Sequence, residues 1–403
     1  MKKTIGLFIG LLLLVGACAS APVEDKNVTQ LKALSDNVKQ NFAPDRRSAI
    51  WEVTFTADTT AQGVVYVAKG AATQAEAKEA LTAAATEKGI KLLDSIKLLP
   101  DPALGEQIYG ITSLSVANFR NSPSHSAEMD TQTLMGMPTR ILEKRGSWWR
   151  GMTPEGYISW SNVGIQPMTK EEYDAWNKAD KIIVTTHYTL FREQPSATAG
   201  VVIDGVWGNV AKAAGEQGGY YKVILPNGKT AFVPKADTQN FSTWLKTRNP
   251  SAANIIATAK QFLGFPYLWG GTSIKGLDCS GFVKTSFFLN GVIILRDASQ
   301  QVQAGEEVDL SDLNNLQPAD LLYFGSKATE TSKERITHVG MYIGNGQFIH
   351  SASSPASVVI NSLIPGAPDY STTAESLIRS KRYIHLIDKD ERIVSVKNHP
   401  WYQ

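Results

Sequence analysis

The chain is poor in cysteine and in net charge, and each shortage limits what the protein can do. Its 403 residues include two cysteines, Cys18 and Cys279, too few for a disulfide framework or a cysteine-rich zinc site. Forty lysines and arginines face 38 aspartates and glutamates, and the formal charge of +2 gives nucleic-acid binding no electrostatic support. We therefore expect no metal, no cofactor and no nucleic-acid partner, and each cysteine needs its own explanation.

Long apolar runs are also absent, since none reaches the ~18 residues of a transmembrane helix. One short run, residues 5–15, follows two lysines and ends in small residues before Cys18. It resembles the signal peptide and lipobox of bacterial lipoproteins, which implies cleavage after residue 17 and acylation of Cys18. The mature chain would then have 403 − 17 = 386 residues and a charge of 38 − 38 = 0. We predict an exported protein, lipid-anchored in the bacterial envelope, in the periplasm at the outer membrane. An ordinary secretory signal is the alternative.

The length predicts roughly 2.7 domains at ~150 residues each. Residues 18–110 indicate a polar tether followed by a small α+β domain. In it, alternating strands are expected at 50–55 and 63–67 and a further strand at 90–98. Between them a helix is expected over 73–88, with Thr73 and Glu76 spaced as a capping box. We identify no chemistry in this domain.

An internal repeat of 72 residues comes next. Without a gap, Arg120 aligns with Arg192 and Gly136 with Gly208. Each copy has short strands joined by Pro/Gly turns, a pattern typical of a small all-β barrel, and both copies resemble bacterial SH3-type barrels. We predict barrel 1 over 111–166, barrel 2 over 182–245, and a linker helix over 167–181 between them.

The two copies differ at a few positions. Glu128 aligns with Gly200, and Tyr157 aligns with Lys229. A residue that the barrel fold itself requires should occur in both copies, so Glu128 and Tyr157 are candidates for a task of barrel 1 alone. Two aromatic residues of barrel 1, Trp148 and Trp149, are compatible with a place in its core or with ligand binding.

The chemistry lies in the α+β unit predicted over 249–386, which precedes a tail at 387–403. Cys279 begins an apolar helix, where free backbone N–H groups lower a thiol pKa and favour the nucleophilic thiolate. Two of the six histidines, His338 and His350, lie on successive predicted strands at 337–343 and 347–352. Strand parity lets both side chains face the cysteine helix, which predicts His338 as the base and His350 as its orienting partner. The alternative is a core cysteine beside two packing histidines.

Five motifs in this unit resemble the NlpC-type cell-wall cysteine peptidases over residues 250–385. They are YLWGG (267–271), LDCSGF (277–282), PADLLYFG (318–325), THVGMYIG (337–344) and FIHSA (348–352). The resemblance implies a papain-like α+β fold and cleavage of amide bonds in peptidoglycan stem peptides. It assigns Cys279 as nucleophile, His338 as general base and His350 as the orienting residue.

Two SH3-type barrels before such a domain resemble the gamma-D-glutamyl-L-diamino-acid endopeptidases, which act on peptides with a free N-terminal L-alanine. This resemblance implies that Glu128, Tyr157 and Asp297 bind the substrate ammonium and that Ser280 contacts the substrate. Tyr267 is either an oxyanion donor beside the N–H of Cys279 or a packing residue. The competing functions are an autolysin of intact peptidoglycan and a non-catalytic lipoprotein that binds the cell wall through its barrels.

Overall fold

The computed structural model describes residues 25–61 and 63–403, which form two compact units. The smaller unit contains residues 25–44 and 51–97, and the larger contains 45–50 and 98–403. The predicted signal peptide and Cys18 lie outside the described residues. Among the residues described, no helix combines the length and apolar character needed to cross a bilayer.

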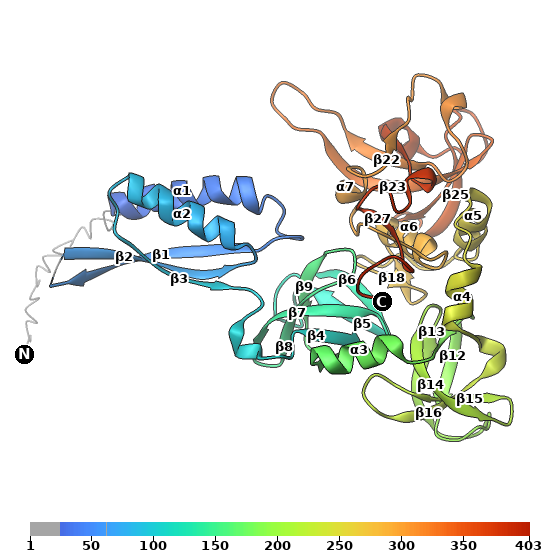
Figure 1. Ribbon diagram of the computed structural model, residues 1–403. Coiled ribbons are helices and arrows are strands. Elements are labelled where there is room, and N and C mark those ends of the chain that lie inside the picture. Colours follow the sequence, from blue (N-terminus) through green and yellow to red (C-terminus); the bar gives the residue numbers. More distant parts are fainter. Residues whose placement is uncertain (1–24, 62) are drawn as a thin grey trace, which may run out of the picture. The chain divides into compact units, whose positions relative to one another are not determined.

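The smaller unit packs two helices over one face of a three-stranded sheet of order β1-β2-β3 (Figure 1). Its elements are α1 (Lys26–Phe42), β1 (Trp51–Thr60), β2 (Gly63–Ala72), α2 (Ala75–Glu87) and β3 (Leu92–Leu98). The tether prediction is wrong for residues 26–42, because Asp25 caps a helix there and Leu31 is fully buried. The predicted capping box is also misplaced, since Gln74 rather than Thr73 is the N-cap of α2.

The two repeats form two seven-stranded sheets of matching topology. The first comprises β4 (Tyr109–Thr112), β5 (Val116–Arg120), β6 (Met129–Leu134), β7 (Pro138–Arg145), β8 (Trp148–Met152), β9 (Ile158–Ser161) and β10 (Ile165–Met168). The second comprises β11 (Lys181–Val184), β12 (Tyr188–Arg192), β13 (Val201–Val206), β14 (Val210–Gln217), β15 (Tyr220–Ile224), β16 (Thr230–Pro234) and β17 (Thr238–Asn240). Their strand orders, β10-β4-β7-β8-β9-β5-β6 and β13-β12-β16-β15-β14-β11-β17, are the same order read in opposite directions. The 72-residue repeat is therefore a repeat of structure.

The linker between the barrels is α3 (Lys170–Lys178), shorter than predicted but capped as the sequence indicates. Thr169 and Glu172 form a complete capping box. In barrel 1, Trp148 is buried, and Trp149 is partly buried against the barrel core. Both tryptophans therefore contribute to packing in barrel 1.

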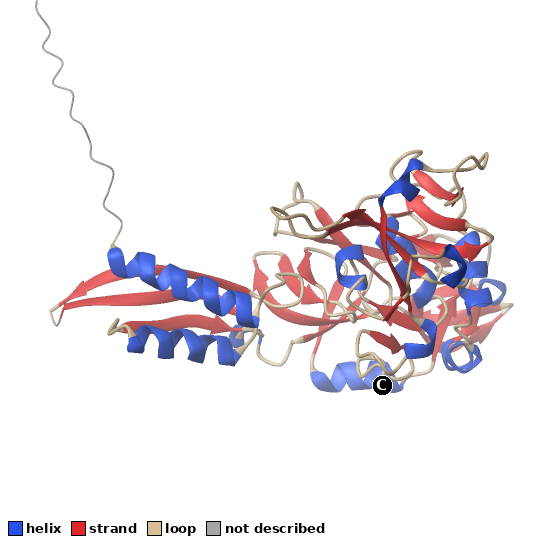
Figure 2. Cartoon of the chain, turned by 90° about the horizontal axis from the view of Figure 1, so that it is seen from above, coloured by secondary structure: helices blue, strands red, loops and turns tan. Residues whose placement is uncertain are grey.

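The C-terminal domain sets helices against a six-stranded sheet of order β21-β26-β22-β23-β24-β25. Its helices are α4 (Phe241–Thr247), α5 (Ala252–Lys260), α6 (Cys279–Phe288) and α7 (Ala298–Gln301). Its strands are β18 (Thr272–Ser273), β19 (Gly276–Leu277), β20 (Val292–Ile294), β21 (Glu306–Glu307), β22 (Leu321–Ser326), β23 (Arg335–Gly344), β24 (Gln347–Ala352), β25 (Ser357–Ser362), β26 (Leu377–Arg382) and β27 (Ile393–Ser395). Strands predominate in the larger unit, as the colouring in Figure 2 shows. The central helix α6 contacts β23 and β24, the strands that carry the two histidines.

One hydrophobic core joins the barrels to the C-terminal domain. It contains Phe282 and Phe287 of α6 together with Val206 and Val210 of barrel 2 and Leu134 of barrel 1. Such shared burial favours contact between barrels and domain, because separating them would expose apolar surface to water. The barrels therefore contribute directly to the shape of the domain's surroundings.

Residues 387–403, which we expected as a tail, are an integral part of this unit. β27 pairs antiparallel with β20. Farther along, the backbone carbonyl of Trp401 accepts a hydrogen bond from the hydroxyl of Tyr173. The imidazole Nε2 of His399 lies 2.9 Å from the carbonyl oxygen of Pro154 in barrel 1. These contacts hold residues 387–403 against the C-terminal domain, the linker helix α3 and barrel 1.

Candidate active site

Cys279 is the first residue of α6, and its surroundings explain why the helix starts there. The carboxylate of Asp278 caps the helix by accepting the N–H of Gly281 at 2.7 Å. A β-carbon at Gly281 would lie 2.0 Å from the carbonyl oxygen of Gly271, so only glycine lets the preceding loop pass this closely. The loop containing Gly271 therefore packs closely against the first turn of α6, which carries Cys279.

The thiol of Cys279 is buried, and this changes its expected chemistry. Backbone N–H groups of Ser280 and Val339 donate to the sulfur and favour the thiolate, but burial outweighs them and raises the pKa of Cys279 to about 12. The lowered pKa expected from the helix start is therefore wrong for the substrate-free protein. The resting thiol keeps its proton at neutral pH, so a base must remove that proton during attack.

His338 and His350 meet on one face of the sheet. The pairing of Met341 with Ile349 puts Gly340 opposite His350, and His338 lies two residues from Gly340 on the same face. The Nε2 atom of His338 lies 2.7 Å from the Nδ1 atom of His350. Burial and the neighbouring His350 lower the pKa of His338 below its ordinary value, so at neutral pH its imidazole is uncharged and can accept a proton.

The hydrogen-bond chain continues to a residue that sequence reasoning missed. The Nε2 atom of His350 lies 2.9 Å from Oδ1 of Asn361, while Nδ2 of Asn361 donates to the carbonyl of Asp369 at 3.0 Å. Because the amide nitrogen of Asn361 is engaged by this carbonyl, its oxygen faces His350. An amide oxygen only accepts, so Nε2 of His350 must carry the proton.

This orientation determines the protonation state of the whole chain of residues. With its proton on Nε2, the neutral His350 presents a lone pair at Nδ1 to His338. His338 must then donate from Nε2, which leaves its Nδ1 unprotonated. Nδ1 is therefore the ring nitrogen of His338 that can accept a proton. A polar residue on the strand after the two histidine strands is the sequence signal that could have identified Asn361.

We expect Asn361→Ala to lower kcat about 10-fold to 100-fold with little change in KM, because His338 would lose its enforced tautomer. The ¹⁵N chemical shifts of the imidazole nitrogens should show His350 as a mixture of tautomers in the variant and as the Nε2–H form in the parent. Asn361→Gln, which keeps the amide, should recover part of the activity. An unchanged kcat and an unchanged tautomer would contradict this role.

A buried ion pair stands directly behind the nucleophile. Arg296 is 1% exposed and reaches Asp278 with its two terminal nitrogens, at 2.5 and 3.1 Å. The same guanidinium donates to Ser280 Oγ at 2.9 Å and to Thr131 of barrel 1 at 3.0 Å. Ser280, expected to touch substrate, therefore has a structural bond in the substrate-free protein. Arg296 couples barrel 1 to the start of α6.

Tyr267, the predicted oxyanion donor, interacts electrostatically with Cys279. Its ring is half-buried, and burial together with Cys279 and Asp278 raises its pKa, so the phenol remains a proton donor at any working pH. Its backbone N–H donates to the carbonyl of Ala356 at 2.9 Å, which anchors the loop. Its role in catalysis stays a prediction.

The three residues predicted to bind an ammonium gather at the side of barrel 1. The hydroxyl of Tyr157 donates to Oδ2 of Asp297 at 3.2 Å, and Glu128 is exposed on the loop before β6. Asp130, which we did not predict, interacts electrostatically with both Glu128 and Asp297. Asp130 aligns with Val202 in the second copy, so the rule that selected Glu128 and Tyr157 would have found it as well.

The same Asp297 oxygen already has a cationic partner. Nη1 of Arg47 lies 2.7 Å from Oδ2 of Asp297. Arg47 belongs to residues 45–50, the N-terminal segment of the larger unit. Sequence reasoning missed Arg47, because 250 residues separate it from Asp297 and it matches none of the motifs.

Barrel 1 forms one wall beside the loop that precedes Cys279. The side-chain oxygen of Gln132 accepts the N–H of Thr272 at 2.9 Å, and its backbone carbonyl accepts the hydroxyl of Thr272 at 3.0 Å. Glu155 forms an ion pair of 3.0 Å with Lys284 of α6. These contacts hold barrel 1 against the loop before Cys279 and against α6.

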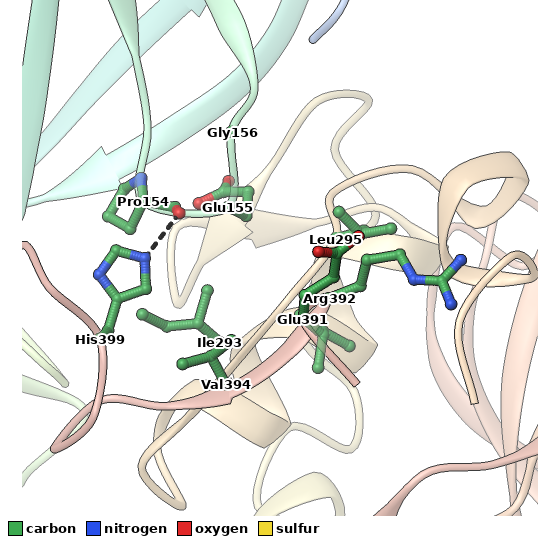
Figure 3. A pocket seen from close by; sticks show the side chains of 10 residues that line it. Pro154, Glu155, Gly156, Ile293, Leu295, Glu391, Arg392, Val394 and His399 are labelled. Atoms are coloured by element: carbon green, nitrogen blue, oxygen red, sulfur yellow. Dashed lines mark hydrogen bonds between the residues drawn. The ribbon is translucent and has the colours of Figure 1, made fainter. Parts of the chain in front are cut away.

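A hollow of about 340 Å³ opens elsewhere in the larger unit (Figure 3). It lies between the barrel 1 turn at residues 154–156, residues 293–295 and the C-terminal segment, where His399 approaches Pro154. None of the residues predicted for catalysis or ammonium binding lines it. This hollow therefore adds no support to the predicted site residues.

Comparisons with known proteins agree with this geometry. The NlpC/P60 family profile matches residues 264–374, and the bacterial dipeptidyl-peptidase Sh3 domain profile matches residues 119–161. A gamma-D-glutamyl-L-lysine dipeptidyl-peptidase of Bacillus cereus is 32% identical over 269 residues, covering 65% of this chain and 77% of that protein. A protein of the same name from Bacillus subtilis is 32% identical over 246 residues, covering 58% of this chain and 76% of the relative.

Among solved structures, an NlpC/P60 family protein from Bacillus cereus matches with a TM-score of 0.58 at 26% identity, covering 68% of this chain and 99% of that chain. The predicted fold class, SH3-type barrels before a papain-like α+β domain, is confirmed. The residues predicted for catalysis and for ammonium binding all lie inside the two matched ranges, whereas Arg47 lies outside both.

Proposed function

Because the chain belongs to the NlpC/P60 family of cysteine peptidases, we propose that it hydrolyses the amide bond between gamma-D-glutamate and a diamino acid in peptidoglycan stem peptides with a free N-terminal L-alanine. The observation that carries this proposal is the acidic cluster on barrel 1 and the loop after β20. The hydroxyl of Tyr157 donates to Asp297 there and interacts electrostatically with Asp130, which in turn interacts with Glu128. The names of the two Bacillus relatives support the bond that is cut.

In the proposed reaction, Nδ1 of His338 takes the thiol proton as the sulfur of Cys279 attacks the gamma-carbonyl carbon. The tetrahedral oxyanion accepts hydrogen bonds from the N–H of Cys279 and the hydroxyl of Tyr267. The imidazolium then returns the proton to the amine of the leaving diamino acid, and a gamma-glutamyl thioester remains. Water, deprotonated by His338, hydrolyses the thioester and restores the thiol.

The acidic cluster supports selection for a free N-terminus. An ammonium removed from water requires carboxylate partners, whereas the acylated nitrogen of a glycan-linked stem is uncharged and bulkier. Burial and Asp297 raise the pKa of Tyr157, so its phenol stays protonated and orients the carboxylate through a hydrogen bond. Free muropeptides of turnover are therefore the proposed substrates, and intact cross-linked peptidoglycan is the competing one.

The test compares L-Ala-gamma-D-Glu-L-Lys and its diaminopimelate analogue with their N-acetylated forms, using mass spectrometry to detect L-Ala-D-Glu. We expect release from the free peptides and roughly 10-fold to 100-fold lower kcat/KM on the acetylated ones. Glu128→Gln should lower kcat/KM about 10-fold on the free peptides only. The control Glu216→Gln, in the equivalent barrel 2, should change neither.

Equal rates on free and acetylated peptides would favour the autolysin, and no hydrolysis of any peptide would favour the cell-wall-binding lipoprotein. Slow iodoacetamide labelling of Cys279 does not separate these functions, because burial keeps its pKa above that of a free thiol. Peptide turnover is therefore the decisive measurement.

A further inference from the structure

The cation at Asp297 is held there by a dedicated set of contacts. Nη1 of Arg47 lies 2.7 Å from Oδ2 of Asp297 and 2.9 Å from the hydroxyl of Ser299. The backbone carbonyl of Arg47 accepts the N–H of Ile158 at 2.6 Å, next to Tyr157. The guanidinium therefore takes the position that an incoming ammonium would need at this carboxylate oxygen.

A second carboxylate holds the other side of the guanidinium. Nε and Nη2 of Arg47 each lie 2.8 Å from an oxygen of Asp45, and Gln300 donates to Asp45 at 2.9 Å. Asp45 and Arg47 together add no net charge to the acidic cluster. The side chains of Arg47 and Asp297 are each 26% exposed, so solvent reaches this ion pair.

We infer that Arg47 is a specificity residue that competes with the substrate ammonium for Asp297 and thereby reduces the preference of the enzyme for a free N-terminus. The inference rests on the proposed function. A substrate ammonium must displace the guanidinium from Oδ2, so its apparent affinity falls with the fraction of protein in which that oxygen is available. An uncharged, acylated N-terminus leaves the Arg47–Asp297 pair of 2.7 Å intact, so Asp297 keeps its shorter ion pair; Nη1 of Arg296 lies 3.8 Å from its other oxygen.

The test measures kcat/KM of Arg47→Met on a free tripeptide and on its N-acetylated form. We expect a rise of about 10-fold on the free peptide, through a lower KM, and a fall of about 10-fold on the acetylated one. The ratio of the two values should therefore rise about 100-fold. If the ratio of kcat/KM on the free peptide to that on the acetylated peptide stays the same or falls in Arg47→Met, the inference is overturned. An arginine that only positions Asp297 would help binding of the free peptide, so its loss would lower this ratio.

The chain offers a matched control in Arg392, which contacts Asp390 two residues earlier through Nε at 2.8 Å and Nη2 at 2.9 Å. Arg392→Met removes the same local pair away from the acidic cluster and should leave the ratio unchanged. Asp45→Asn gives the opposite expected result. It releases Arg47 from its other anion, strengthens the pair with Asp297, and should lower kcat/KM on the free peptide about 3-fold.

Thermal unfolding midpoints of all variants establish that they are folded. If Arg47→Met does not fold, Asp45→Asn still tests the inference. A rise in kcat/KM on the free peptide in Asp45→Asn would contradict the inference. Failure of the parent protein to release dipeptide from either peptide would instead contradict the proposed function. If the parent protein releases the dipeptide but Arg47→Met leaves the ratio of the two kcat/KM values unchanged, only the role of Arg47 is contradicted and the proposed function stands.

Discussion

Cys279→Ala should abolish dipeptide release, with a fall in kcat of roughly 10⁴-fold or more, because no thioester can form without the sulfur. His338 would retain its hydrogen bond to His350 but have no thiol to deprotonate. Mass spectrometry of the peptide products over extended incubation provides the measurement. The variant should still bind the free tripeptide, because the acidic cluster on barrel 1 is untouched.

Ser286→Ala is the matched control for this change. Ser286 lies on the same helix, is fully buried, and donates to the carbonyl of Phe282 at 2.8 Å. Its loss should cost about 1 kcal/mol of stability without abolishing turnover. Persistent hydrolysis by Cys279→Ala would exclude the cysteine mechanism. Binding of the tripeptide by this variant would then show only that the tripeptide is a ligand.

Arg296→Met should lower the free energy of unfolding by roughly 3–5 kcal/mol, the largest stability effect that we predict. The reason is that Asp278, 9% exposed, would be left as a buried carboxylate without its counter-charge. The N-cap of α6 and the position of Cys279 depend on the same carboxylate, so activity should fall as well. Urea unfolding monitored by tryptophan fluorescence gives the free energy.

Arg379→Met is the comparison for an exposed pair. Arg379 is 43% exposed and forms ion pairs of 3.3 Å with Glu307 and 3.1 Å with Glu334. Such pairs contribute less than about 1 kcal/mol, because water and salt screen them. The double variant Asp278→Asn with Arg296→Met should recover part of the lost stability. A loss in Arg296→Met no greater than in Arg379→Met would show that the buried pair does not hold the helix start.

Local patterns predicted much of the fold. The strands expected at 337–343 and 347–352 correspond to β23 and β24, because alternation and tight turns are properties of neighbouring residues. The helix α1 was missed although Val28, Leu31, Leu34 and Val38 recur at helical spacing, because these four apolar residues lie in a stretch that is otherwise mostly polar. The strand β26, which lies between β21 and β22, was missed because its sequence, LIRSKR, mixes basic and apolar residues without a clear turn before it.

In the candidate site, too, some residues can be predicted from local sequence and others cannot. Aligning the two barrel copies separates residues of one copy from residues of the fold, which selects Glu128 and Tyr157 and would also have selected Asp130. Asn361 and Arg296 gain their roles only from contacts across the sheet and between domains. No spacing in the chain encodes such contacts, because each depends on how separate elements pack.

The sequence by itself determined the helix start at Cys279 and the shared strand face of His338 and His350, because capping and strand parity are local. Only the tertiary structure decided that the thiol is protonated at rest, because burial of the sulfur outweighs the N–H groups at the helix start. It also decided which cation Asp297 holds in the substrate-free protein. That partner, Arg47, lies 250 residues away in the chain, and folding alone brings the two charges within 2.7 Å.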